Sequence, residues 1–443
     1  MLPYLIPFRW HWSRRTVCAA LLTKTEILLS TLYIRISEYL PDILKSEYVV
    51  FNTISLDIHM NKPYNYFDIQ NNYRAYSRKG IWMNKQELHI GNKTAKLPLI
   101  QGGMGVGVSL SGLAGAVARE GGIGIISTAQ IGFREPDFAQ DSKKANLRAM
   151  VFELEKAKKI SRRMDGTCDG LLGYNIMVAT RDYGDYARTA AKAGADVIIS
   201  GAGLPVDLPA YVDGTDTKIA PIVSSEKAAR IILKMWDRHY HRTADFLVIE
   251  SAHAGGHLGF SNEMLAHLYE NGFDSDYDQE IRKIIACTKG YGEKYGVSIP
   301  VITAGGILNA SQVCHALSLG ADGVQVATPF VTTEECDAAL PFKQAYVNAC
   351  AEEIEIVTSP VGMPARAIHN SFLDRMKKGR EKITRCYRCL EKCSPNTAPY
   401  CITQALIRAV EGDVENGLIF CGDNVQYLTK ISTVPEVIQT LFP

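Results

Sequence analysis

The chain has 443 residues, of which 47% are hydrophobic and 21% are charged, and 48 basic against 47 acidic side chains leave a formal net charge of +1. This balance excludes a disordered or collagen-like chain and a strongly basic nucleic-acid-binding protein. The length is compatible with about three domains, or with one α/β barrel of ~250 residues and appendages.

Residues 1–82 show no repeat and no sustained hydrophobic period. Arg9, Arg14 and Arg15 lie in the middle of the first apolar stretch, whereas a secretory signal peptide places its charges before that stretch. From Met83 the sequence reads like the polar start of a small enzyme. We therefore expect residues 1–82 to be an N-terminal extension, with an unusual N-terminal subdomain as the alternative. We also expect a cytoplasmic protein with reduced thiols.

The uncharged stretch 97–118 has enough residues to cross a bilayer, but it contains Pro98, Gln101 and six glycines. A glycine-rich ligand loop explains it better. Beyond it, apolar runs alternate with helical patterns as far as residue 333. The helical patterns include Ser142–Arg163, Tyr183–Ala193, Glu226–His239, Tyr277–Tyr295 and Ala310–Leu319.

Eight apolar runs are continuous rather than alternating, which is typical of parallel strands in a sheet that is buried on both faces. Eight strand–helix units in roughly 240 residues match the size of a (β/α)8 barrel. We predict an α/β fold, a TIM barrel over residues 83–385, with a doubly wound open sheet as the alternative. The runs are residues 97–104, 122–127, 170–179, 195–200, 218–223, 244–250, 299–306 and 321–327.

Glycine-rich segments follow several of these predicted strands, where barrel enzymes carry their active sites. GGMGVG follows the first strand, SGAG the fourth, SAHAGGHLG the sixth and AGG the seventh. Glycines after the seventh strand, together with Ala327–Thr328 after the eighth, predict a phosphate site, because backbone N–H groups can approach an anion there. Tight turns are the alternative for any single glycine. No acidic residue ends the second strand, so a Rossmann dinucleotide site is disfavoured.

Six segments in this order resemble the FMN-dependent nitronate monooxygenases, formerly called 2-nitropropane dioxygenases, and their relatives, the flavin-containing enoyl-acyl-carrier-protein reductases. They are QGGMGVG, GYNIMVA, ISGAGLP, SAHAGGHLG, PVITAGGI and GVQVATPF. The resemblance extends over residues 97–372, because SPVGMPARAIHNSF is similar to the segment that follows the barrel in this family. It implies a TIM barrel that binds one FMN and requires no metal.

The resemblance also implies how each segment holds the flavin. The first strand's loop lies against the ring, an asparagine in the third strand bonds the ring's polar edge, and the loops after strands 7 and 8 bind the phosphate. The family usually has Gly-Thr where this chain has Ala327–Thr328, which makes Ala327 the weakest assignment. The implied cofactor-binding residues are Gly102, Gly103, Met104, Asn175, Gly255, Gly256, Gly305, Gly306, Ala327 and Thr328.

His257 in AGGHLG is the candidate catalytic residue, because it matches the active-site histidine that the resemblance implies. An imidazole with an ordinary pKa of ~6.5 exchanges protons near neutral pH. A core histidine bonded to a backbone carbonyl is the alternative. His253 lies on the same predicted loop, so we expect it to support the site or gate the substrate rather than to bind a metal. Glu250 could orient an imidazole, contact the flavin's ribityl chain or cap a strand.

The implied reaction is the oxidation of an alkyl nitronate by dioxygen, through FMN, to a carbonyl compound and nitrite. The alternatives are an NAD(P)H-dependent enoyl-thioester reductase and a non-catalytic flavin-binding protein. The monooxygenase and the reductase both need a flavin and a proton-transfer residue, so the motifs do not distinguish these two enzymes. We expect a small-molecule substrate, dioxygen or NAD(P)H as the redox partner, and neither nucleic acid nor membrane as a partner. The oligomeric state, a homo-oligomer included, stays open.

The tail, residues 386–443, is rich in cysteine. Cys386, Cys389, Cys393 and Cys401 form C-x2-C-x3-C-x7-C, which matches neither a ferredoxin run nor a paired zinc ribbon. Structural or redox-active thiols are the favoured interpretation, and metal binding stays open. PYCITQALIRAVEGD predicts an amphipathic helix that ends near Gly412 and packs this helical, cysteine-rich appendage onto the barrel.

Overall fold

The computed structural model describes residues 87–271, 273–360 and 362–443. The extension expected over residues 1–82 lies outside the described residues. Within them, the uncharged stretch 97–118 forms a buried strand, a glycine-rich loop and most of helix α3 (Ser111–Arg119). No helix of the described part is long and apolar enough to span a bilayer.

Eight parallel strands close into a barrel in the order β10-β11-β3-β4-β5-β6-β7-β8, so the predicted TIM barrel is confirmed and the open sheet is excluded. Each predicted apolar run overlaps one strand, and every residue of β4 and of β6 is buried, as expected for a sheet covered on both faces. The strands are β3 (Leu99–Gln101), β4 (Ile123–Ser127), β5 (Leu171–Met177), β6 (Val197–Gly201), β7 (Lys218–Val223), β8 (Leu247–Glu250), β10 (Val301–Ala304) and β11 (Gly323–Val326).

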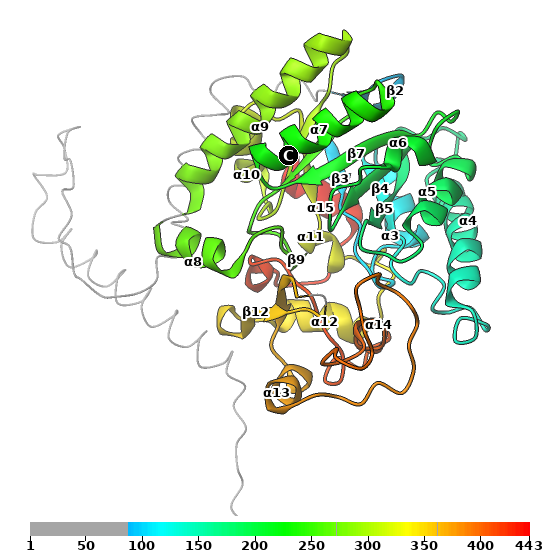
Figure 1. Cartoon of the computed structure of the whole chain (residues 1–443), viewed down its shortest axis with the longest axis vertical. Helices are drawn as coiled ribbons and strands as arrows, with labels where there is room; N and C mark the ends of the chain where they lie inside the picture. The colour runs from blue at the N-terminus through cyan, green and yellow to red at the C-terminus, as the bar shows by residue number, and fades with distance from the viewer. Residues whose placement is uncertain (1–86, 272, 361) are drawn as a thin grey trace, which may run out of the picture. The chain divides into compact units, whose positions relative to one another are not determined.

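Helices surround the barrel (Figure 1), and all five predicted helical patterns form helices. Side-chain caps fix the starts of three of them: Asp141, Ser225 and Asn309 each accept a hydrogen bond from a backbone N–H of the first turn. The helices between the strands are α3, α4 (Ser142–Ile160), α5 (Tyr183–Lys192), α6 (Leu208–Tyr211), α7 (Glu226–Tyr240), α8 (Asn262–Asn271), α9 (Phe273–Tyr295), α10 (Ala310–Ser318) and α11 (Thr328–Val331).

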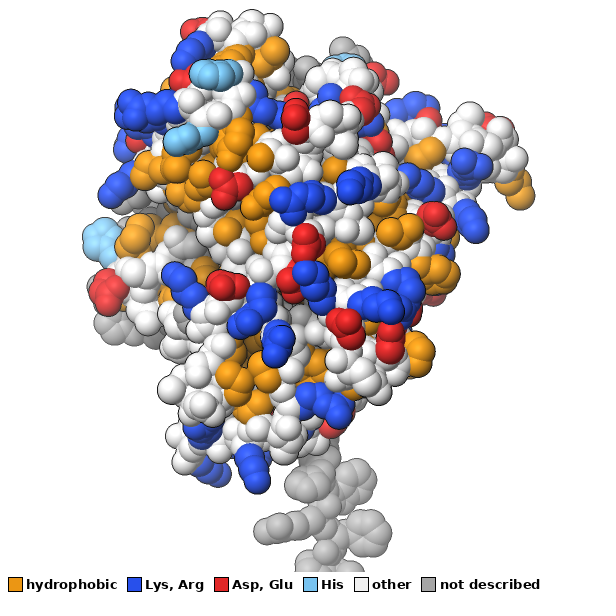
Figure 2. Space-filling model, turned by 45° about the vertical axis from the view of Figure 1, so that its right-hand side comes forward, with side chains coloured by type: hydrophobic (Ala, Val, Ile, Leu, Met, Phe, Trp, Pro, Cys, Tyr) orange, Lys and Arg blue, Asp and Glu red, His pale blue; other side chains and the backbone are white. Residues whose placement is uncertain are grey.

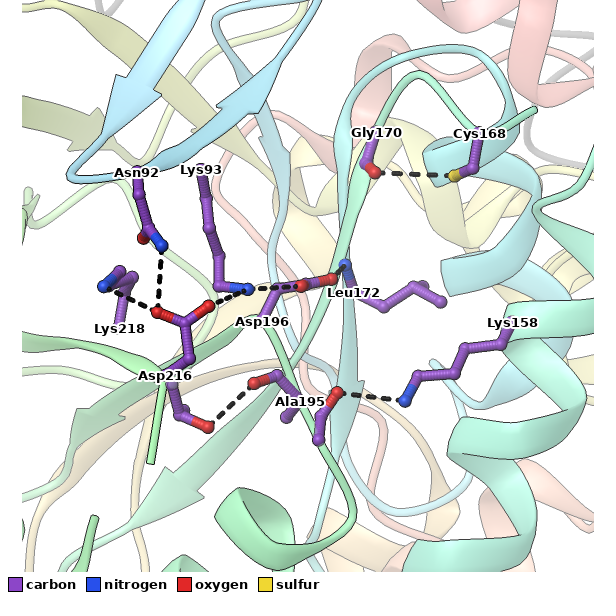
Figure 3. A network of polar contacts seen from close by, with 12 residues as sticks. Asn92, Lys93, Lys158, Cys168, Gly170, Leu172, Ala195, Asp196, Asp216 and Lys218 are labelled. Atoms are coloured by element: carbon purple, nitrogen blue, oxygen red, sulfur yellow. Dashed lines mark hydrogen bonds and ion pairs between the residues drawn. The ribbon is translucent and has the colours of Figure 1, made fainter. Parts of the chain in front are cut away.

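A hairpin of β1 (Leu88–Ile90) and β2 (Lys93–Ala95) closes the N-terminal end of the barrel. Leu88 and Ile90 are buried in the cluster that fills the barrel interior. Lys93 Nζ lies 3.0 Å from a carboxylate oxygen of Asp196 and 3.0 Å from one of Asp216, and these two residues stand just before β6 and β7 (Figure 3). The hairpin is therefore held by both apolar burial and ion pairs.

Residues after the barrel form a second layer beside its C-terminal end, drawn in yellow to red at the bottom of Figure 1. A three-stranded sheet joins β12 and β13 to the short strand β9, which lies within the loop that follows β8. The predicted tail helix is α14, and α15 packs back onto α3 and α10. The elements are α12 (Leu340–Asn348), β12 (Ile354–Thr358), β13 (Pro364–Ile368), β9 (Gly256–His257), α13 (Ser371–Lys378), α14 (Ile402–Val410) and α15 (Val434–Leu441).

The surface carries charges of both signs. On the face drawn in Figure 2, basic and acidic side chains are interspersed among small apolar areas. This mixture agrees with the near-zero net charge of the chain.

Candidate active site

A cavity of about 440 Å³ opens at the C-terminal ends of the barrel strands. This volume lies in the range of small-molecule and cofactor sites. All eleven site residues predicted from the sequence line this one cavity: His257, Gly102, Gly103, Met104, Asn175, Gly255, Gly256, Gly305, Gly306, Ala327 and Thr328. The structure therefore brings together residues that are separated by up to 226 positions in the chain.

The loop after β3 meets β5 through a contact that only glycine permits. A Cβ atom on Gly103 would lie 2.4 Å from Cβ of Asn175, which is closer than two carbon atoms can pack. Gln101, fully buried at the end of β3, fixes this corner because its side chain bonds both the N–H and the carbonyl of Ile125. The backbone of Gly102 and Gly103 thus forms a flat wall beside the asparagine side chain.

The loops after β10 and β11 also present backbone to the cavity. Gly305 and Gly306 have φ of +100° and +75°, a region that favours glycine, and a Cβ on Gly305 would lie 2.4 Å from Oγ of Ser251. The methyl group of Ala327 lies 3.4 Å from where a Cβ on Gly102 would be. No lysine or arginine lines the cavity within the described residues, so a phosphate there would be bound by backbone N–H groups.

His257 lies in β9, which pairs with β13 at Ala365, so the segment predicted as a loop is partly a strand. Its ring stands edge-on to Phe420, with ring centroids 5.2 Å apart. Burial lowers the pKa of His257 below the ordinary value of 6.5, so the imidazole is neutral at neutral pH. Its Nε2 atom is buried without a hydrogen-bond partner among the described residues, which calls for an explanation in a native fold.

Glu250 and His253 also line the cavity, and the roles expected for them stay predictions. Burial raises the pKa of Glu250 from 4.5 to about 7, and Tyr277 donates a hydrogen bond to its backbone carbonyl. His253 pairs through Nδ1 with the carboxylate of Asp423, 170 residues further along the chain. This histidine is therefore tied to the tail.

The segment Phe420–Asn424 lines the cavity and was not predicted from the sequence. Asn424 Nδ2 donates to the carbonyl of Gly306 at 2.7 Å. A Cβ on Gly255 would lie 2.7 Å from the backbone of Cys421, so this glycine is needed for the close approach of the tail. Because these partners are more than 100 residues apart, no local pattern in the sequence could reveal the contact.

The cysteine-rich tail forms part of the cavity wall. Cys389 lines it together with Leu390, Ile402 and Leu406. Burial raises the pKa of the Cys389 thiol to about 11, and Cys386, Cys389, Cys393 and Cys401 carry free thiols. Within residues 87–271, 273–360 and 362–443, no three histidine, cysteine or acidic side chains are arranged to hold a metal ion.

Comparisons with known proteins identify the family of the chain. The sequence model of the nitronate monooxygenase family matches residues 86–443, so the match includes the cysteine-rich tail. The chain is 24% identical over 282 residues to the Mycobacterium tuberculosis (3aS,4S,5R,7aS)-5-hydroxy-7a-methyl-1-oxo-octahydro-1H-indene-4-carboxyl-CoA dehydrogenase, covering 64% of this chain and 66% of that protein. It is 28% identical over 172 residues to a probable nitronate monooxygenase of Staphylococcus saprophyticus, covering 38% and 41%. Each alignment spans less than two thirds of the relative's own length.

Solved structures share the fold. FabK from Thermotoga maritima matches with a TM-score of 0.56 at 24% identity, over 78% of this chain and 91% of that one. Nitroalkane oxidase from Streptomyces ansochromogenes matches with a TM-score of 0.57 at 19% identity, over 78% and 95%. The family match covers most of the chain and all of the cavity, and the chain therefore belongs to the nitronate monooxygenase family of flavin-dependent oxidoreductases.

Proposed function

We propose that this chain is an FMN-dependent nitronate monooxygenase in which His257 is the proton-transfer residue. The observation that carries the proposal is that His257, whose buried Nε2 atom has no hydrogen-bond partner among the described residues, lines the same cavity as the glycine-rich loops. The family match supports the reaction class.

The donor set of the cavity fits FMN. Gly305 and Gly306, with Ala327 and Thr328, offer backbone without bulky side chains for a single phosphate, and the wall of Gly102 and Gly103 suits a flat ring. A dinucleotide such as FAD would need a second phosphate loop. When bound, the flavin would supply the redox chemistry between the substrate and dioxygen, and dioxygen would supply the oxygen atom of the carbonyl product.

His257 would act on the substrate carbon. Because its pKa is lowered, the neutral imidazole keeps a lone pair available over a wider pH range than a free histidine does. With a neutral nitroalkane, Nε2 would take the α proton. With a nitronate, which has already lost that proton, the same atom would position the bound anion. Phe420 and Leu418 would exclude water from this side of the cavity.

An enoyl-thioester reductase is the second candidate, and one feature of the cavity favours it. Leu390, Ile402, Leu406 and Leu418 form an apolar wall that suits an acyl chain. The Mycobacterium tuberculosis relative is named as a dehydrogenase of a carboxyl-CoA compound. Under this alternative NAD(P)H would supply the electrons, and His257 would supply a proton.

The test is to purify the full chain, release its cofactor by heat and identify it by chromatography. The protein is then assayed with an alkyl nitronate, following oxygen uptake and nitrite, and in parallel with NADPH and an enoyl thioester. We expect FMN and nitrite formation. Recovery of FAD, or failure to bind any flavin on reconstitution, contradicts the cofactor assignment; turnover of the thioester alone replaces the first function by the second.

A further inference from the structure

Arg366 is a buried cation that the proposed reaction does not use. It lies in β13, it is 1% exposed, and it is absent from the residues that line the cavity. Burying a guanidinium costs free energy unless its N–H donors are satisfied, so its hydrogen-bond partners indicate which segment it holds.

Two hydrogen bonds of its guanidinium reach the loop that carries His257. Arg366 Nη2 donates to the carbonyl of Ala252 at 2.8 Å, and Nη1 donates to the carbonyl of Ala254. The backbone of Arg366 is opposite Gly256 in the pairing of β13 with β9. One residue therefore holds the loop between β8 and β9 through both its side chain and its backbone.

The tail presses on the same loop from another side. The carbonyl of Arg366 accepts a hydrogen bond from the N–H of Cys421, and Cys421 packs against Gly255. Tyr346 donates from its hydroxyl to the carbonyl of Phe420, whose ring contacts His257. Arg366 is thus the point at which the sheet, the tail and the loop meet.

The direction of the peptide groups gives this contact a chemical meaning. In a trans peptide the C=O and the following N–H point in opposite directions. Because the carbonyl of Ala254 faces the guanidinium, the N–H of Gly255 points away from it, and Gly255 lines the cavity. A charge-assisted hydrogen bond also polarises the peptide, which makes that N–H a stronger donor to an anion.

We propose that Arg366 is a positioning residue for the reaction: it clamps residues 252–256 so that His257 and the N–H of Gly255 are held toward the bound flavin and an anionic substrate. This inference rests on the proposed function, because it assigns the residue that orients the proposed base. A simple stabilising anchor is the competing explanation, and it makes different predictions.

The experiment compares Arg366→Met, Arg366→Lys and Arg366→Ala in the full chain. The first measurement is hydrogen–deuterium exchange of the flavin-free protein. We expect exchange in residues 251–258 to rise ~10-fold or more in Arg366→Met while the barrel strands keep their protection, because this loop loses two hydrogen bonds that hold its carbonyls. Since this measurement needs no substrate, it remains decisive even if nitronate is not the substrate.

The second measurement separates positioning from stability. With whichever substrate the wild type turns over, we expect kcat of Arg366→Met to fall ~10–100-fold with KM changed by less than ~3-fold, as for a displaced catalytic group. Guanidinium ions added to Arg366→Ala should restore part of kcat, whereas methylammonium ions should not, because only the planar cation bonds both carbonyls. Arg366→Lys keeps the charge, and the same measurements are made on this variant if the other two do not fold.

Arg408→Met is the matched control. The Arg408 guanidinium of the tail donates to Glu381 at 3.0 Å, and no hydrogen bond in the described part of the chain joins it to the loop. For Arg408→Met, we expect both kcat and hydrogen–deuterium exchange in residues 251–258 to match the wild type. Two results in Arg366→Met would overturn the proposal and leave Arg366 as an anchor only. One is a uniform increase in hydrogen–deuterium exchange across the chain. The other is kcat and loop exchange within ~2-fold of the wild type.

Discussion

The N-terminal end of the barrel carries a network of paired charges, whereas the cavity at the C-terminal end contains a buried polar atom without a described partner. At the N-terminal end, Lys93 pairs with Asp196 and Asp216, and Asn92 and Lys218 also bond Asp216 (Figure 3). At the C-terminal end, Nε2 of His257 has no partner among the described residues, and Glu250 is buried with its pKa raised to about 7. The paired charges stabilise the first end, whereas the Nε2 atom of His257, which lacks a described partner, lies at the end where barrel enzymes bind their ligands.

Among substitutions that test the difference between the two ends, we expect the largest effect on turnover at His257. Replacing it by Asn should leave flavin bound while turnover of a neutral nitroalkane falls by ~10²–10⁴-fold, the usual contribution of general acid–base catalysis. Turnover of a pre-formed nitronate should fall less, because its α proton is already gone. Steady-state kinetics with both substrates provide the measurement, and equal losses would remove the base role.

The next effect concerns pH and Glu250. A carboxyl whose folded pKa is raised from 4.5 to about 7 favours folding below pH 4.5 and loses that contribution as the pH rises through 7, which amounts to ~3 kcal/mol at most. Glu250→Gln should therefore gain stability over the wild type at pH 8 but not at pH 5. Urea unfolding at both pH values tests this, with the exposed Glu411→Gln as the control. The same difference at both pH values would show that the carboxyl does not titrate on folding.

A smaller effect is expected where the loop after β3 meets β5. Gly103→Ala would place a Cβ 2.4 Å from Asn175, so we expect a loss of ~1–3 kcal/mol in stability together with weaker flavin binding. Gly290, in α9, has open space around it, and Gly290→Ala should instead add up to ~1 kcal/mol. Thermal melts and flavin titration of the two variants distinguish a packing limit from a general preference for glycine.

The smallest effect is expected at the closed end. Lys93→Met should lower the free energy of unfolding by ~1–2 kcal/mol, because it removes a partly buried ion-pair network, and the loss should shrink in high salt. It should leave kcat unchanged, since Lys93 lies at the opposite end of the barrel from the cavity. If kcat changed when equal amounts of folded protein are compared, the N-terminal end would also contribute to catalysis, and the distinction between the two ends would be wrong.

The barrel and the loops that line its cavity could be predicted from local patterns in the sequence. Continuous apolar runs specify strands buried on both faces, and glycines such as Gly305 stand where the backbone requires positive φ, so both signals are local in the chain. Every residue predicted for the site, from Gly102 to Thr328, lines one cavity, while the roles assigned to these residues stay predictions.

How the tail completes this cavity could not be predicted from the sequence, because it depends on long-range packing. The pair of His253 with Asp423, the bond of Asn424 to Gly306 and the clamp of Arg366 on Ala254 each join residues more than 100 positions apart. Such contacts depend on where β13 and the tail fold back, and not on the local pattern around any partner. A buried Arg366 reads in the sequence like any surface arginine, because burial is a property of packing.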